Sequence, residues 1–113
     1  MCVQFQMGRM HAVRERLVKI CSVTIMLSVA PSATVDDICP AAVEKHSCLD
    51  QEMPVDGKYI LLFPDGQRVV NTPGSTEKFT LYGYKHFTGK PYQKLALFLC
   101  SVEDYNAGKH AGM

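Results

Sequence analysis

The chain lacks the features that would mark a membrane span, a nucleotide-binding loop or a nucleic-acid-binding protein. No apolar run reaches the roughly 18–20 residues that cross a bilayer, because Ser22, Thr24 and Ser28 interrupt the longest candidate, residues 20–30. The phosphate-binding patterns GxxxxGK(S/T) and GxGxxG are absent. The net charge is only +1, from 12 basic and 11 acidic residues, and gives no case for nucleic acid or an anionic membrane as the main partner.

Cysteine usage likewise lacks a disulfide pattern. The chain holds 5 cysteines, an odd number, and no CxxC pair. This argues against a disulfide framework and favours a reducing, intracellular setting, in the cytoplasm or the nucleus. Arg9, Arg14 and Arg16 lie where the apolar region of a signal peptide would have to be, so we expect no signal peptide. We expect most of the thiols to be small core or surface residues: Cys2, Cys21, Cys39, Cys48 and Cys100.

No group of residues forms a recognisable catalytic or metal-binding pattern. Cys39, His46 and Cys48 come closest to a metal set, but their spacing matches no common zinc pattern and a fourth ligand is not in view. A nucleophilic thiol at Cys48 or Cys100 would need a histidine placed by the fold, and the sequence carries no signature for one. We therefore expect no enzymatic activity, no cofactor and no metal.

What the chain does contain is a strand that runs directly into a helix. Every second residue over 25–29 is apolar, which predicts a strand with one buried face, and Pro31 ends it because proline cannot donate to a ladder. Thr34 is then a good N-cap, followed by acidic residues where the helix dipole favours them. Pro40 lies inside the predicted helix, so the helix either starts late or is kinked there.

The later elements follow from apolar runs between turn signals. Residues 58–70 predict a hairpin, because Pro64 presets φ for a turn and Gly66 accepts a positive φ. Residues 79–84 fit either a short strand or a single helical turn. Alternation over residues 95–100 predicts a final strand.

The two ends of the chain are less clearly patterned. Residues 3–7 alternate and predict a first strand that stops at Gly8. Residues 10–20 have apolar side chains at three-to-four spacing, which fits a short helix or a backward extension of the later strand. Residues 101–113 are polar and contain glycine, so we expect a flexible tail.

Together these elements predict an α+β fold, with a mixed sheet of four or five strands curled around the helix that follows Thr34. The expected core consists of the inward positions of the strands and the helix: Ile25, Leu27, Val29, Val35, Ile38, Ala42, Leu61, Leu95, Leu97 and Leu99.

The order and spacing of these elements resemble the ubiquitin-like β-grasp superfamily. Residues 23–35 resemble its second strand and helix entry, residues 59–69 its third strand, tight turn and short fourth strand, and residues 79–99 its end. The chain departs from the pattern at Pro40 and in its longer N-terminal region. The resemblance divides the chain into an N-terminal extension or first strand, a ubiquitin-like domain and a flexible tail: residues 1–22, 23–100 and 101–113.

The resemblance implies a non-catalytic protein-interaction module that docks its partner, such as a ubiquitin-binding type of domain, through an exposed sheet face. Ubiquitin's hydrophobic patch falls on Leu62 and Phe98 here, with Ala96 nearby. Strand alternation agrees, because these positions face outward if Leu61 and Leu97 face the core. The alternative, that another part of the chain covers this face, stays open.

Two other roles within the superfamily carry different requirements. A Ras-association or Ras-binding domain would meet a small GTPase through basic residues, for which the sequence offers Arg14, Arg16, Lys19 and Lys45. The outward positions of the second strand carry no positive charge, which weakens this alternative. A conjugated modifier would need a C-terminal Gly-Gly, whereas Gly112 follows an alanine here, so we do not expect that role.

Overall fold

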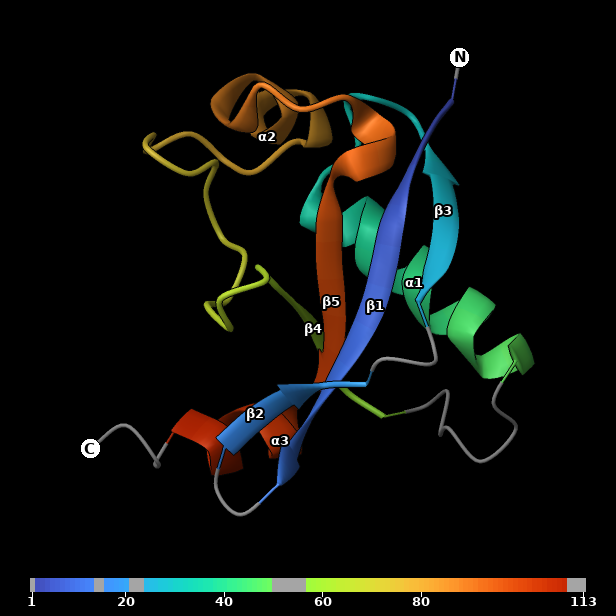
Figure 1. The fold of residues 1–113 in the computed structure, drawn as a ribbon, viewed down its shortest axis with the longest axis vertical. Helices are drawn as coiled ribbons and strands as arrows, with labels where there is room; N and C mark the ends of the chain where they lie inside the picture. Colours follow the sequence, from blue (N-terminus) through green and yellow to red (C-terminus); the bar gives the residue numbers. More distant parts are fainter. Residues whose placement is uncertain (1, 14–15, 21–23, 50–56, 110–113) are drawn as a thin grey trace.

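The computed structural model describes residues 2–13, 16–20, 24–49 and 57–109, which form a mixed five-stranded sheet with helices on both faces (Figure 1). The strands are β1 (Val3–Val13), β2 (Arg16–Lys19), β3 (Ile25–Val29), β4 (Tyr59–Leu62) and β5 (Ala96–Ser101). The helices are α1 (Val35–Leu49), α2 (Leu81–Thr88) and α3 (Val102–Lys109), with a short 3₁₀ turn at Tyr92–Lys94. The predicted α+β class and mixed sheet are confirmed. No helix among the described residues is long and apolar enough to cross a membrane.

The long strand β1 organises the sheet. One of its sides pairs in parallel with β5, where Met7 lies opposite Leu97. On the other side, its first half pairs antiparallel with β3 and its second half with β2. Strand β4 pairs antiparallel with β5 and forms the far edge of the sheet. The first and the last strand of the described chain therefore lie side by side at the centre of the sheet.

Strand β1 does not stop at Gly8, so that prediction is wrong. Gly8 lies opposite Phe98 in the register, and a Cβ at this position would lie 2.6 Å from the Phe98 ring. The glycine therefore makes room for an aromatic ring rather than ending the strand. Of the two alternatives for residues 10–20, the helix is wrong, because Met10–Val13 pairs with β2.

The main core lies between the sheet and α1, as predicted. Seven expected core residues are buried: Leu27, Ile38, Ala42, Leu61, Leu95, Leu97 and Leu99. The other three, Ile25, Val29 and Val35, are partly buried and pack against them. Phe5 and Met7 of β1 complete this face of the sheet. An aromatic group of Phe63, Phe79 and Tyr84, with ring centroids 5.4–6.0 Å apart, extends the core to α2.

Helix α1 begins directly after Thr34, as the cap predicted. The backbone N–H and hydroxyl of Thr34 donate to a carboxylate oxygen of Asp37 at 3.1 and 3.2 Å. The helix then continues through Pro40, so a late start is wrong. Pro40 lies on the exposed side of α1. Because proline has no N–H, the helical hydrogen bond to the Asp36 carbonyl is missing, but the proline ring faces solvent and not the core.

The 58–70 hairpin forms, although its return arm is reduced to the isolated Leu62–Arg68 bridge. Gly66 has φ 91°, as the turn requires, and its N–H donates to the Phe63 carbonyl at 2.8 Å. Residues 79–84, which fitted a strand or a helical turn, enter α2. Thr80 caps that helix by accepting the Gly83 N–H at 3.1 Å.

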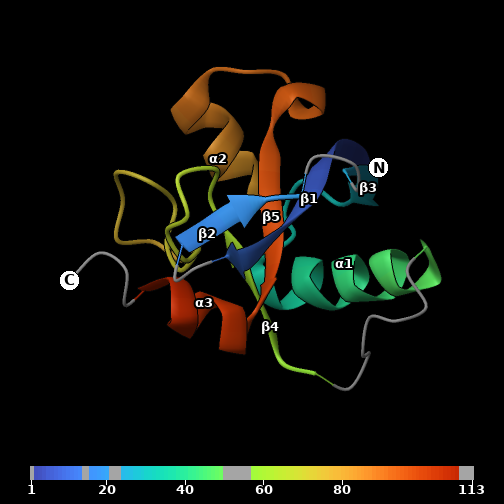
Figure 2. The ribbon, with the colours of Figure 1, turned by 60° about the horizontal axis from the view of Figure 1, so that its bottom comes forward.

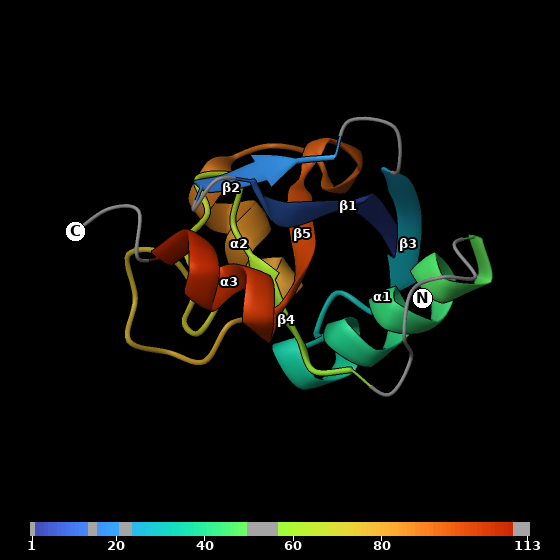
Figure 3. The same cartoon turned by 90° about the horizontal axis from the view of Figure 1, so that it is seen from below.

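Helix α3 packs on the second face of the sheet, beside strand β2 and on the side away from α1 (Figures 2 and 3). We expected a flexible tail from residue 101, whereas residues up to Lys109 form α3. A cap and tertiary packing together hold this helix: the Ser101 hydroxyl accepts the Asp104 N–H at 3.1 Å, and Val102 and Tyr105 pack against the sheet. Residues 110–113 lie outside the described part of the chain.

Candidate functional site

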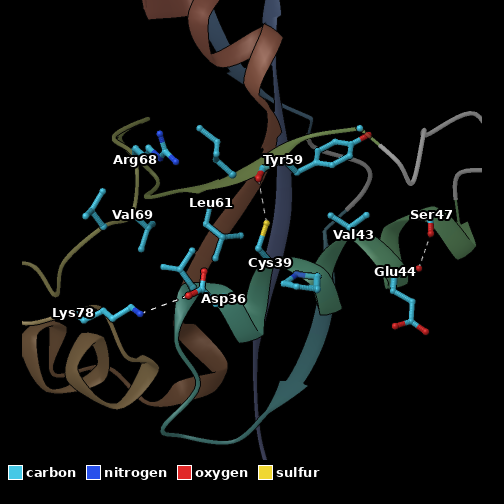
Figure 4. Close-up of a pocket in the computed structure, with 15 residues that line it drawn as sticks. Asp36, Cys39, Val43, Glu44, Ser47, Tyr59, Leu61, Arg68, Val69 and Lys78 are labelled. Carbon is cyan, nitrogen blue, oxygen red and sulfur yellow. Dashed lines mark hydrogen bonds and ion pairs between the residues drawn. The ribbon is translucent and has the colours of Figure 1, made fainter.

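A groove of about 760 Å³ lies between α1 and the edge strand β4 (Figure 4). We call it the α1–β4 groove. Its lining is mainly apolar, from one stripe of the helix and the facing side of the hairpin: Val35, Cys39, Val43, Leu61 and Val69. Val70 at its mouth is 59% exposed, which is high for a valine. The groove thus presents apolar surface to a ligand, in the size range of small-molecule and peptide sites.

Helix α1 turns two rows of side chains toward the sheet, one fully buried and one that packs at the rim of the core. Ile38, Ala42 and His46 are buried against the sheet. Val35, Cys39 and Val43, at i, i+4 and i+8, are only partly buried and line the groove. In the sequence, this side of α1 is marked by apolar residues that lie next to the buried row and extend the apolar surface of the helix.

Cys39 ties the helix to the edge strand. Its thiol donates to the Tyr59 carbonyl at 3.4 Å (Figure 4). Burial raises the pKa of the Cys39 thiol above its ordinary value, and the nearby Asp36 carboxylate adds to the effect. The thiol therefore stays protonated at neutral pH, as a weak hydrogen-bond donor and a poor nucleophile.

Charged side chains surround the apolar lining. On the α1 side, Lys78 lies 3.6 Å from Asp36 across one end of the groove, and both side chains are exposed. Glu44 lies toward the other end, where the Ser47 hydroxyl donates to its backbone carbonyl at 2.8 Å. Arg68 lies on the other side of β4 from the helix (Figure 4). Apolar surface framed by both signs of charge favours a peptide-like ligand over a hydrocarbon.

The three residues that come closest to a metal set in the sequence do not converge in the structure. His46 is 2% exposed on the core side of α1, Cys48 is exposed, and Cys39 lies in the groove. Among the described residues no group of three or more His, Cys, Asp or Glu is placed to hold a metal ion.

The structure places Leu62, Ala96 and Phe98 on the sheet face opposite the main core, as their alternation predicted. Their expected exposure is wrong: Leu62 is 0% and Phe98 9% exposed, and Ala96 is partly buried. They join a second apolar cluster, which β2 and α3 cover through Leu17, Val102 and Tyr105. The Lys19 ammonium also lies 5.2 Å from the centre of the Phe98 ring.

The basic residues of the GTPase alternative lie along the sheet edge opposite β4. Arg16 and Lys19 are exposed on β2. Lys45 of α1 reaches β3, where its ammonium donates to the Met26 carbonyl at 2.6 Å. Arg14 lies outside the described residues.

Comparisons with protein-family models, with curated proteins and with solved structures find no match.

Proposed function

We propose that the protein is a non-catalytic intracellular module that docks a protein partner on a ubiquitin-like β-grasp scaffold. The sheet arrangement supports the scaffold: β1 and β5 are parallel neighbours at the centre, with β3 outside β1 and β4 outside β5. Helix α1 follows β3, which takes the place of the second strand of this scaffold, and packs across the sheet. Strand β2 and helix α3 are additions to this plan.

The α1–β4 groove is the observation that carries the docking function. The sheet face around Leu62 and Phe98 is already occupied by the chain itself. The groove instead leaves partly buried valines and the exposed Val70 open beside an edge strand. Apolar surface in such a position is typical of protein-interaction sites.

Affinity capture from cell extract tests this proposal. Val70→Asp places a charge at the mouth of the groove. Val18→Asp is its matched control, because Val18 is 38% exposed on β2, a strand that does not line the groove. We expect wild type and Val18→Asp to retain the same proteins and Val70→Asp to lose them, with unchanged circular dichroism. Capture that survives Val70→Asp, or no capture by wild type, would contradict docking at the groove.

A second candidate, a small-GTPase-binding domain, is favoured by one observation. Arg16, Lys19 and Lys45 place basic side chains along the edge formed by β2 and β3. Such a surface accelerates association with an acidic partner.

A panel of GTP-loaded small GTPases tests this candidate by surface plasmon resonance. Lys19→Glu combined with Lys45→Glu should slow association, and moderate salt should mimic the effect. Absence of binding to every member of the panel would contradict this role and leave the groove as the docking surface.

A further inference from the structure

We infer that helix α2 and the turn after it bind single-stranded nucleic acid. Aromatic side chains exposed on the helix stack on the bases, and the lysines around them contact the phosphates. The inference goes beyond the docking function proposed above, because no residue from 79 to 95 lines the α1–β4 groove. We call the side chains that carry it the α2 surface: Tyr82, Lys85, His86, Phe87, Lys90 and Lys94.

Charge is distributed unevenly along the chain, although the net charge is only +1. Residues 79–95 contain three lysines, one histidine and no carboxylate. Three of the 12 basic residues lie here and none of the 11 acidic residues, so the rest of the chain carries a net charge of −2. This local excess of positive charge favours an anionic ligand, which the net charge of the whole chain does not reveal.

The helix dipole accounts for only part of this positive charge. Lys85 and His86 lie in the last turn of α2, where cations interact favourably with the dipole. The effect falls off beyond that turn, and Lys90 and Lys94 follow the C-cap at Gly89. Both lysines are exposed, and neither forms an ion pair with another described residue. They can therefore contact phosphates without breaking an existing ion pair.

Exposed rings add a feature that an ionic ligand alone does not need. Tyr82 is 55% exposed and Phe87 60% exposed. Tyr82 and His86, one helical turn apart, form a T-shaped pair with ring centroids 4.4 Å apart. In such a pair each ring keeps at least one face that the other ring does not contact. A base of any identity can stack on a free ring face, because every base has a π-face.

Backbone contacts hold α2 in place on two sides. The Tyr82 N–H donates to the Pro31 carbonyl at 2.9 Å, which fixes the start of the helix to the turn after β3. Gly83 lets the loop of residues 71–77 approach the helix, because a Cβ there would lie 2.9 Å from the Thr72 hydroxyl oxygen. The backbone that carries the exposed rings is thus fixed before a ligand binds, which lowers the entropy cost of binding.

The combination of rings and lysines selects a single strand among anionic ligands. In a duplex the bases stack on one another and hide their faces, whereas a single strand offers both base faces and phosphates. An acidic peptide supplies the charge but not the flat rings. An anionic membrane attracts lysines but takes up apolar side chains, and among the exposed side chains described for α2 only Phe87 is fully apolar.

Fluorescence anisotropy of the whole protein with labelled oligo(U) and oligo(dT) tests the inference. We expect saturable binding of one or both at low salt, and the ratio of the two affinities distinguishes RNA from DNA. The logarithm of the association constant should fall with the logarithm of salt concentration with a slope of about −2, as for about three phosphate contacts on a single strand. A duplex of equal length should compete about tenfold less well or worse.

Variants separate the contribution of the rings from that of charge. Tyr82→Ala combined with Phe87→Ala should weaken binding about tenfold or more, whereas Tyr82→Phe keeps the ring and should keep the affinity. Lys90→Glu combined with Lys94→Glu should weaken binding and reduce the salt slope to about −0.7 or less. Circular dichroism should be unchanged throughout, because the substituted side chains are exposed.

Arg16→Glu combined with Lys58→Glu is the matched control for charge. Both residues are exposed, and the change in net charge is the same as for the lysine pair of the α2 surface. Arg16 lies on β2, and the Lys58 carbonyl accepts the Val102 N–H at the start of α3. Strand β2 and helix α3 lie at the opposite end of the molecule from α2 (Figure 1). This variant should therefore keep the wild-type affinity and salt slope.

Four results would each overturn the inference. These are no binding of either oligonucleotide at low salt, equally tight binding of the duplex, affinity that is insensitive to loss of the rings, and equal competition by polyglutamate. Sedimentation with phosphatidylserine-containing vesicles, without oligonucleotide binding, would assign the α2 surface to a membrane instead. None of these results bears on the docking function, which is tested separately by Val70→Asp in the groove.

Discussion

At the scale of single residues, Gly8 and Phe98 show how a side chain on one strand dictates the residue on its neighbour. The Phe98 ring lies over the β1 backbone, and two of its carbons would lie 2.6 and 2.8 Å from a Cβ at position 8. The ring is held there by the second apolar cluster and by the Lys19 ammonium. Only glycine leaves enough space without moving β5 or the ring.

We expect Gly8→Ala to lower the free energy of unfolding by about 1–3 kcal/mol, the usual cost of overpacking. Urea denaturation followed by circular dichroism measures this. The cost should shrink in a Phe98→Leu background, because the smaller side chain relieves the overlap. Equal costs in the two backgrounds would show that the clash is not the cause.

Cys100 is a second residue whose chemistry is decided by its surroundings. It is 1% exposed, and burial raises the pKa of its thiol to about 12. Asp104 raises this pKa further, whereas Arg9 lowers it. The thiol therefore remains protonated and unreactive at neutral pH.

In the native protein at pH 8, we expect iodoacetamide to modify the exposed Cys2 and Cys48 well before Cys100, as mass spectrometry of the labelled peptides can show. Early labelling of Cys100 would contradict the buried, neutral thiol.

The raised pKa of Cys100 also predicts how stability depends on pH. An unfolded thiol ionises near 9.0, so the stability that comes from keeping Cys100 neutral is complete below pH 9 and declines as the pH rises through about 12. Cys100→Ala should flatten this part of the stability curve relative to wild type.

At the scale of elements, α3 is held to the sheet by few apolar side chains. Among the side chains of this helix that the structure describes, Val102 and Tyr105 are the two that pack against the second cluster. A helix of 8 residues is marginal in isolation, so α3 depends on these two contacts and on its Ser101 cap. In turn, the helix keeps Leu62 and Phe98 out of solvent.

We expect Tyr105→Ala to reduce the free energy of unfolding by about 1–2 kcal/mol and to increase binding of an apolar dye such as ANS, because Phe98 becomes exposed. Asn106→Ala, at an exposed position of the same helix, is the control. Equal effects of the two substitutions would show that α3 does not cover the cluster.

At the scale of the whole molecule, the parallel pair of β1 and β5 joins the first and the last strand of the described chain. Residues from Gln6 to Arg9 lie opposite residues from Ala96 to Leu99, nearly the full length of the sequence away. Both strands also pair on their other sides and contribute to the main core. Opening this pair therefore requires most of the sheet to come apart.

Amide hydrogen exchange checks this expectation residue by residue. The amides of β5 and of the first half of β1 should exchange last, at the free energy of global unfolding, whereas those of β2 and α3 should exchange earlier through local opening. Exchange of β5 as early as α3 would contradict a sheet organised around β1 and β5.

The sequence by itself determined the elements whose signals are local. Alternation over 25–29, the Thr34 cap and the turn at Gly66 identified a strand, a helix and a hairpin, and the inward positions gave the core around Ile38 and Leu97. These succeed because strand and helix periods decide which side of an element is apolar before any long-range contact forms. The same alternation placed Leu62 and Phe98 on the correct face of the sheet.

Only the tertiary structure decided what lies on each face. Gly8 resembled a strand end until the register with Phe98 was known, and the tail became α3 because Tyr105 finds an apolar cluster to cover. The α1–β4 groove depends on the spacing between a helix and a strand that are separate in the chain. Exposure and cavities arise from contacts between distant segments, and a residue's own neighbours in sequence carry no record of them.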